Sequence, residues 1–100
     1  MLKITLAREP EPPTLKLEGK LSGPWVNELE HAWTEISQPG EMRLLVDLSD
    51  VTFISAEGQK LLKSMFKQGV DLQSRSLMTR FILSQIKKEC NGNHATDNGG

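Results

Sequence analysis

The order in which strand-like and helix-like apolar patterns follow one another constrains this chain most strongly. Alternating apolar residues come first, at residues 2–6 and 15–18, and three segments with helical spacing then alternate with two short apolar runs. Alternation predicts a half-buried strand, whereas spacing of three and four residues predicts an amphipathic helix. The predicted order is strand, strand, helix, strand, helix, strand, helix. This order indicates an α/β fold in which helices pack on a central mixed sheet of about four strands.

The middle of the chain is the most informative part. A first helix is expected over residues 24–37 and a second from about residue 56 until Gly69. Between them, residues 44–46 are apolar without alternation, which is typical of a strand covered on both faces. The segment Asp-Leu-Ser-Asp, residues 47–50, is expected to end that strand.

The third predicted helix covers residues 76–89, and the composition changes after it. Its expected inward residues are Leu77, Met78, Phe81, Ile82 and Ile86, with Leu83 on the outer side. Residues 90–100 are polar and rich in Gly and Asn, so they bury too little apolar surface to offset their ordering entropy. We therefore expect one domain over residues 1–89 and a disordered tail over residues 90–100.

The composition excludes several classes of function. The formal net charge of -1 gives no overall field that would recruit nucleic acid or an acidic membrane surface. No apolar run is long enough to span a bilayer, and the first residues lack the pattern of a signal peptide. The single cysteine, Cys90, cannot form an internal disulfide. We therefore expect a cytoplasmic protein with no nucleic-acid partner and no direct membrane insertion.

The sequence contains no recognisable pattern for catalysis, metal binding or a cofactor. His31 and His94 lack Cys, Asp or Glu partners at metal-ligand spacing. No phosphate-binding glycine loop and no nucleophile elbow is present. Asp47 and Asp50 could form a carboxylate pair, although an Asp at a strand end more often binds local backbone amides. We expect a protein that is not an enzyme and has no metal and no cofactor.

Basic residues gather on one side of the second predicted helix. Lys60, Lys63 and Lys67 lie three and seven residues apart, which predicts one exposed stripe opposite the apolar face. Such a stripe is either a solvated helix face or a recognition surface for an acidic partner. No aromatic platform accompanies it, so the stripe does not indicate nucleic-acid binding.

A motif over residues 46–58 carries the most specific signal in the sequence. It reads Val-Asp-Leu-Ser-Asp, then Val-Thr-Phe-Ile, then Ser-Ala-Glu-Gly ahead of a helix. This motif resembles the central segment of STAS domains, which occur in sulfate transporters and anti-sigma factor antagonists. Residues 17–22 and 69–72 resemble two further strands of the family, and the resemblance covers roughly residues 2–89.

The resemblance implies a non-catalytic module for protein–protein interaction and partner switching. Antagonists of this family bind an anti-sigma factor that is also a kinase, and phosphorylation of a serine at the start of the second helix breaks the complex. Here Glu57 stands at the position of that serine, and Ser22 and Ser55 replace two family aspartates. Glu57 is either a favourable first-turn carboxylate or a permanent mimic of the modified serine. Ser55, the expected N-cap, is a weaker alternative acceptor.

We therefore expect a partner-binding surface at the turn before the second helix and along that helix. Its residues would be Ser22, Ser55, Ala56, Glu57, Gly58, Lys60, Lys63 and Lys67. The expected partner is an anti-sigma factor or kinase in a bacterial signalling pathway that regulates transcription. Two alternatives stay open, namely a STAS accessory subunit of a membrane transport system and a nucleotide-binding regulatory domain.

Overall fold

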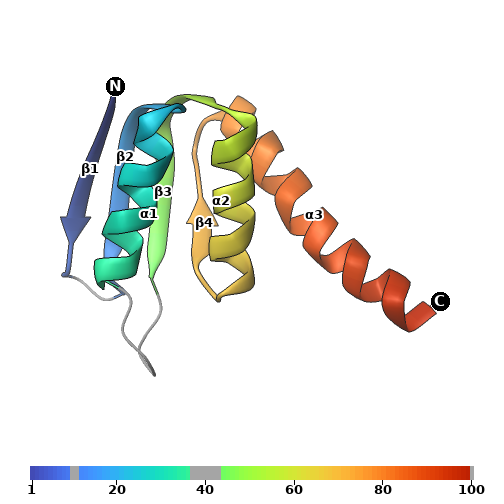
Figure 1. Cartoon of the computed structure of the whole chain (residues 1–100). Helices are drawn as coiled ribbons and strands as arrows, with labels where there is room; N and C mark the ends of the chain where they lie inside the picture. Colours follow the sequence, from blue (N-terminus) through green and yellow to red (C-terminus); the bar gives the residue numbers. More distant parts are fainter. Residues whose placement is uncertain (10–11, 37–43, 100) are drawn as a thin grey trace.

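The computed structural model describes residues 1–9, 12–36 and 44–99 of the chain. Two strands and a helix come first, and two further strand–helix pairs follow, in the order that the sequence predicted (Figure 1). The elements are β1 (Leu2–Ala7), β2 (Thr14–Leu21), α1 (Pro24–Ile36), β3 (Leu45–Ile54), α2 (Ala56–Lys67), β4 (Asp71–Gln73) and α3 (Leu77–Gly99). The predicted α/β class is confirmed.

The four strands form one mixed sheet in the order β1-β2-β3-β4. β1 and β2 are antiparallel, with Ile4 opposite Leu17, whereas β2 pairs with β3 and β3 pairs with β4 in parallel. Both parallel connections run through a helix, because the chain must return to the starting end of the sheet before it can add a parallel strand. The predicted mixed sheet is therefore confirmed.

The hydrophobic core lies between the sheet and the helices, with α1 and α2 lying across one face of the sheet (Figure 1). Alternate strand residues are buried, because successive side chains of a strand point to opposite faces. The side chains that are less than 2% exposed are those of Leu15, Leu17, Leu21, Leu29, Val46, Leu48, Leu62, Met65 and Leu72. Polar residues lie between the buried positions, as in a sheet with one solvated face.

β3 is longer than the sequence predicted, and it buries one face rather than two. Residues 47–50 were expected to end the strand, but β3 continues to Ile54. Val46 and Leu48 are buried, whereas Asp47 between them is only partly buried. The two predictions were wrong for one reason. An apolar run of three residues does not show which of its side chains face the core, and in β3 register irregularities space the buried positions at Val46, Leu48, Val51 and Ile54.

α3 presents to the core a different face from the predicted one. Leu77, Met78 and Phe81 were expected to point inward, but they are 81%, 68% and 64% exposed. Leu83, which was expected on the outer side, is 3% exposed. Ile86 is buried as predicted. Apolar residues surround the start of this helix on several sides, so their spacing alone did not define the inward face.

Hydrogen bonds to β3 determine how the start of α3 is oriented. β4 is short and pairs only with residues 45–47 of β3, which leaves the later part of that edge without a neighbouring strand. The Thr79 hydroxyl, which is 4% exposed, donates to the Val51 carbonyl at 3.3 Å. The Ser74 hydroxyl donates to the Leu48 carbonyl at 3.3 Å. A buried carbonyl needs a donor, and these two contacts place Thr79 rather than Met78 against the sheet.

The end of α3 also differs from the prediction. The sequence indicated that the helix ends near residue 89 and that a disordered tail follows, but the helix continues to Gly99. The side chains after Cys90, including that of His94, lie outside the described residues. The domain limit at residue 89 stays a prediction.

Candidate functional site

The candidate site is centred on the turn that joins β3 to α2. Ser55 is the N-cap of α2, with φ of -74° and ψ of 172°, and its hydroxyl oxygen accepts a hydrogen bond from the Gly58 N–H at 3.1 Å. The Ser55 carbonyl accepts the first helical bond, from the Gln59 N–H at 2.9 Å. The cap satisfies an amide that the helix cannot satisfy itself. The predicted N-cap role of Ser55 is therefore confirmed.

The turn is held against the end of β2. Leu21 lies opposite Ile54 in the parallel register, and the Ser55 N–H donates to the Leu21 carbonyl at 3.0 Å. Ser22 and Ser55 are the residues that follow this pair, so the two serines lie together at one edge of the sheet. Ligands and partners of open α/β sheets commonly bind outside the carboxyl ends of parallel strands. Both serines are partly buried.

Gly58 allows α2 to begin this close to β2. It is buried, and a Cβ atom built on it would lie 2.8 Å from the Leu21 carbonyl oxygen and 3.0 Å from Cγ2 of Ile54. Any larger residue would push the helix away from the strand. Gly58 therefore shapes the turn from inside and offers little surface of its own to a partner.

Ala56 and Glu57 form the exposed part of the turn. Both residues are exposed, and Glu57 lies in the first turn of α2. None of the hydrogen bonds or ion pairs within the described parts of the chain involves the Glu57 carboxylate. Helix N-termini favour negative charge because their first amides lack partners. The site thus presents one carboxylate to solvent beside a capped helix start.

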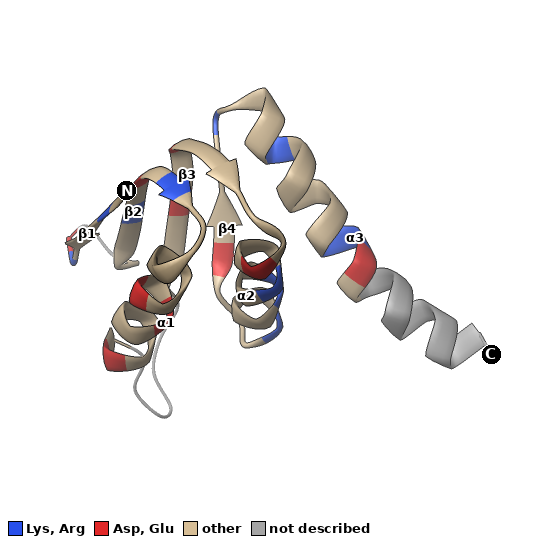
Figure 2. Cartoon of the chain, turned by 45° about the horizontal axis from the view of Figure 1, so that its top comes forward, with Lys and Arg blue, Asp and Glu red and all other residues tan. Residues whose placement is uncertain are grey.

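The three lysines of α2 do not form a single stripe. Lys60 and Lys67 are exposed, but the Lys63 ammonium pairs with the Glu89 carboxylate of α3 at 2.7 Å. The hydrogen bond that Lys63 donates to the Glu89 carboxylate raises the pKa of Lys63, with the negative charge of the carboxylate adding to the effect. Figure 2 shows the acidic start of α2 followed by basic positions along the helix. The predicted stripe therefore reduces to Lys60 and Lys67, with Lys63 directed to α3.

Asp47 and Asp50 each interact with a different partner and do not form a carboxylate pair with each other. Asp47 Oδ1 accepts hydrogen bonds from the Ser49 hydroxyl at 2.6 Å and the Ser49 N–H at 3.0 Å. Asp50 forms an ion pair with Lys16 at 3.4 Å. The largest influence on the Asp47 carboxyl is burial, which raises its pKa, but the Ser49 hydrogen bonds and the charges of Lys16 and Arg75 together hold that pKa below its ordinary value. Both carboxylates have structural partners.

The described residues contain no group of three or more His, Cys, Asp or Glu side chains that could hold a metal ion. Within residues 1–9, 12–36 and 44–99, no helix combines the length and the apolar composition needed to cross a membrane.

Comparison with known proteins identifies the fold of the chain. No protein-family model matches the chain, and no curated protein matches its sequence. Among solved structures, the chain is similar to an anti-sigma factor antagonist from Mycobacterium paratuberculosis, with 19% sequence identity and a TM-score of 0.72 over 96% of this chain and 82% of that chain. The chain has the STAS fold. The resemblance inferred from residues 46–58 is confirmed at the level of the fold.

Two other solved structures are similar to this STAS fold. One is described as Mglu and is 20% identical, with a TM-score of 0.57 over 72% of this chain but only 19% of that chain. The other is an uncharacterized protein from Shewanella loihica with a SpoIIAA-like fold, 20% identical, with a TM-score of 0.48 over 87% of this chain and 77% of that chain. At 20% identity, the likeness to Mglu extends to the fold of the matched region alone.

Proposed function

We propose that this chain is a non-catalytic protein-interaction module of the anti-sigma factor antagonist type. Its partner would be an anti-sigma factor with kinase activity, in the cytoplasm of a bacterial cell, and its output would be the regulation of transcription. The observation that carries the proposal is the β3–α2 turn. On a fold shared with an anti-sigma factor antagonist, this turn presents the Glu57 carboxylate, which has no partner among the described residues, at the start of α2.

The negative charge of Glu57 supports the proposal that this turn permanently resembles one that carries a phosphorylated serine. A carboxylate carries about one negative charge and a phosphate about 1.5 to 2, so Glu57 supplies part of the field of a phosphorylated serine at the same place. A partner that rejects the phosphorylated form would bind wild-type protein weakly. A partner that needs no release would bind it constitutively.

Ser55 is a poor substitute as a phosphate acceptor. Its hydroxyl oxygen already accepts the Gly58 N–H at 3.1 Å, and the residue is partly buried against β2. A kinase would have to break this cap to reach the hydroxyl, and an N-cap contributes about 0.5–2 kcal/mol. The proposal therefore gives the switch position to Glu57 and a structural role to Ser55.

Affinity capture from the cytosol of the native cell tests the proposal. Wild type, Glu57→Ser and Glu57→Gln are used as baits, and bound proteins are identified by mass spectrometry. The glutamine variant removes the charge but keeps the shape of the side chain. We expect a kinase-like anti-sigma factor to be enriched by Glu57→Ser over wild type. Capture of transporter subunits at equal yield by all three baits would contradict the proposal and favour a transport accessory subunit.

A further inference from the structure

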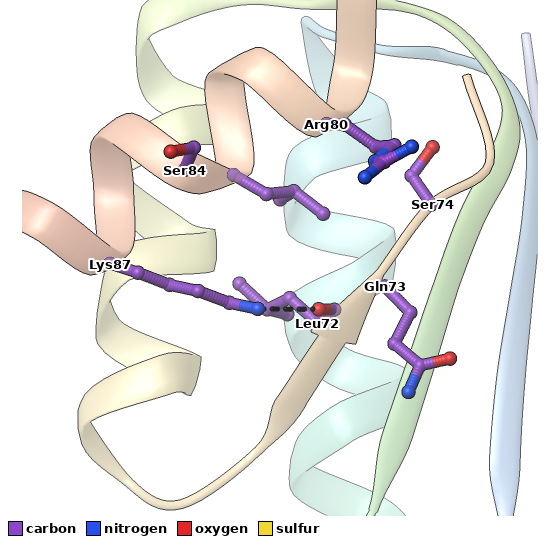
Figure 3. Close-up of a pocket in the computed structure, with 7 residues that line it drawn as sticks. Leu72, Gln73, Ser74, Arg80, Ser84 and Lys87 are labelled. Carbon is purple, nitrogen blue, oxygen red and sulfur yellow. Dashed lines mark hydrogen bonds between the residues drawn. The ribbon is translucent and has the colours of Figure 1, made fainter. Parts of the chain in front are cut away.

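A second feature lies on the opposite side of α2 from α1, where α3 passes the free edge of β4. An open cavity of about 490 Å³ is found there, lined by Leu72, Gln73, Ser74, Arg80, Leu83, Ser84 and Lys87. Figure 3 shows α3 contributing Arg80, Ser84 and Lys87, and β4 with the residue after it contributing the other labelled side chains. Its volume is in the range of small-molecule sites.

The charges around this cavity have one sign. The described lining includes two cations, Arg80 and Lys87, and no carboxylate. The two apolar lining residues, Leu72 and Leu83, are only 1% and 3% exposed, so they contribute little of the exposed lining. The cavity therefore favours an anion over a neutral ligand.

Lys87 is fixed in position and still has donors to offer. Its ammonium donates to the Leu72 carbonyl at 3.1 Å and lies 6.0 Å from the centre of the Phe66 ring. An ammonium has three donors, so two stay available for a ligand. The Arg80 guanidinium has no hydrogen bond or ion pair among the described residues, and in Figure 3 it extends toward Ser74. A planar guanidinium binds phosphate oxygens in a bidentate manner.

The same contacts disfavour a peptide strand as the ligand. A strand adds to a sheet edge through outward-pointing N–H and C=O groups. β4 is three residues long, and the carbonyl of its central residue, Leu72, is already occupied by Lys87. The Ser74 hydroxyl is also occupied, because it donates to the Leu48 carbonyl and accepts the Ser76 N–H at 3.1 Å. A compact ligand that uses the cations fits better.

We propose that the cavity between β4 and α3 binds a small-molecule anion of the diphosphate class, with Arg80 and Lys87 as its two cationic contacts. The two residues are seven positions apart, which separates their Cα atoms by about 10 Å along the helix axis on one side of the helix. A single phosphate can bind only one of these two cations fully, whereas two linked phosphates can contact both. This site is separate from the β3–α2 turn.

Titration of the whole chain with inorganic phosphate, inorganic diphosphate and a nucleoside diphosphate tests this site, at constant ionic strength. Calorimetry gives the affinity, and amide shifts in NMR spectra locate the contact. We expect diphosphate to bind about tenfold more tightly than phosphate, with shifts at Gln73, Ser84 and Lys87. A further gain with the nucleoside diphosphate would mean that the cavity also holds the nucleoside. Equal affinities for the two diphosphates would limit the site to the phosphate groups.

Matched variants separate this site from general surface charge. Arg80→Gln and Lys87→Gln should each weaken diphosphate binding about tenfold, as expected for a lost charge-assisted contact. Lys88→Gln makes the same charge change at an exposed neighbour outside the cavity and should change affinity less than twofold. The Arg80 side chain has no hydrogen-bond or ion-pair partner among the described residues. Arg80→Gln should therefore fold normally even if Lys87→Gln does not. Non-saturable binding, or equal losses in Arg80→Gln and Lys88→Gln, would overturn the proposal.

Discussion

Gly58→Ala is the sharpest test of how the candidate site is built. In an ordinary helix this change stabilises, because alanine exceeds glycine in helix propensity by about 0.5–1 kcal/mol. Here the new Cβ would lie 2.8 Å from the Leu21 carbonyl oxygen, 3.0 Å from Cγ2 of Ile54 and 3.1 Å from Cγ of Leu21. Overpacking of this kind costs about 1–3 kcal/mol. We expect a net loss of about 1–2 kcal/mol in the free energy of unfolding.

Urea unfolding followed by circular dichroism measures this loss, which should also lower Tm by about 4–8 °C per kcal/mol. Ser64→Ala is the control, because Ser64 is an exposed interior residue of α2 and the change adds no atom to the helix. That change should be neutral or slightly stabilising. If Gly58→Ala proves as stable as wild type while Ser64→Ala behaves as expected, the close contact between α2 and β2 is not what positions the turn.

Three further predictions concern the cap, the face of α3 and the pH dependence of stability. Ser55→Ala should lower the free energy of unfolding by about 1 kcal/mol through loss of the cap, and Ser55→Asp should restore most of it; equal stability of all three proteins in urea would contradict the cap. Leu83→Ala should cost about 2–5 kcal/mol, whereas Phe81→Ala should change stability by less than about 0.5 kcal/mol, and the reverse order in thermal unfolding would support the face that the spacing indicated. Because the pKa of Asp47 is lowered in the folded state from its ordinary value of 3.8, its stabilising contribution is present above that value and is lost as the pH falls through the lowered pKa. Asp47→Asn should therefore be less stable than wild type in urea at pH 7 and approach it at pH 2, and a constant difference at both pH values would refute the assignment.

Local signals were enough to predict the element order and the start of α2. The alternation at β1 and β2 and the helical spacing of α1 and α2 each follow from one buried face against solvent. The N-cap role of Ser55 followed from residue type and position alone. These features depend on contacts that are close in sequence, and a pattern can therefore report them.

The features that were predicted wrongly depend on contacts between distant residues. The orientation of α3 depends on Thr79 and Ser74 finding β3 carbonyls that the short β4 leaves open. The predicted stripe did not anticipate that Lys63 pairs with Glu89, which lies 26 positions further along the chain. The cavity lined by Arg80 and Lys87 was not predicted either. The spacing of seven residues between Arg80 and Lys87 predicts that they lie on one side of a helix. The sequence did not show that β4 lies beside that side and forms a cavity with it.

The affinity of the purified chain for its captured anti-sigma factor tests the central claim most directly. Calorimetry would compare wild type, Glu57→Ser and the control Glu30→Ser, which removes an exposed carboxylate from α1. If Glu57 acts as a permanent counterpart of a modified serine, Glu57→Ser should bind about tenfold more tightly, a difference of about 1.4 kcal/mol, and should become a substrate of the kinase. Glu30→Ser should match wild type. Equal affinities for all three proteins, with no phosphorylation at position 57, would contradict the claim and make Glu57 an ordinary first-turn carboxylate.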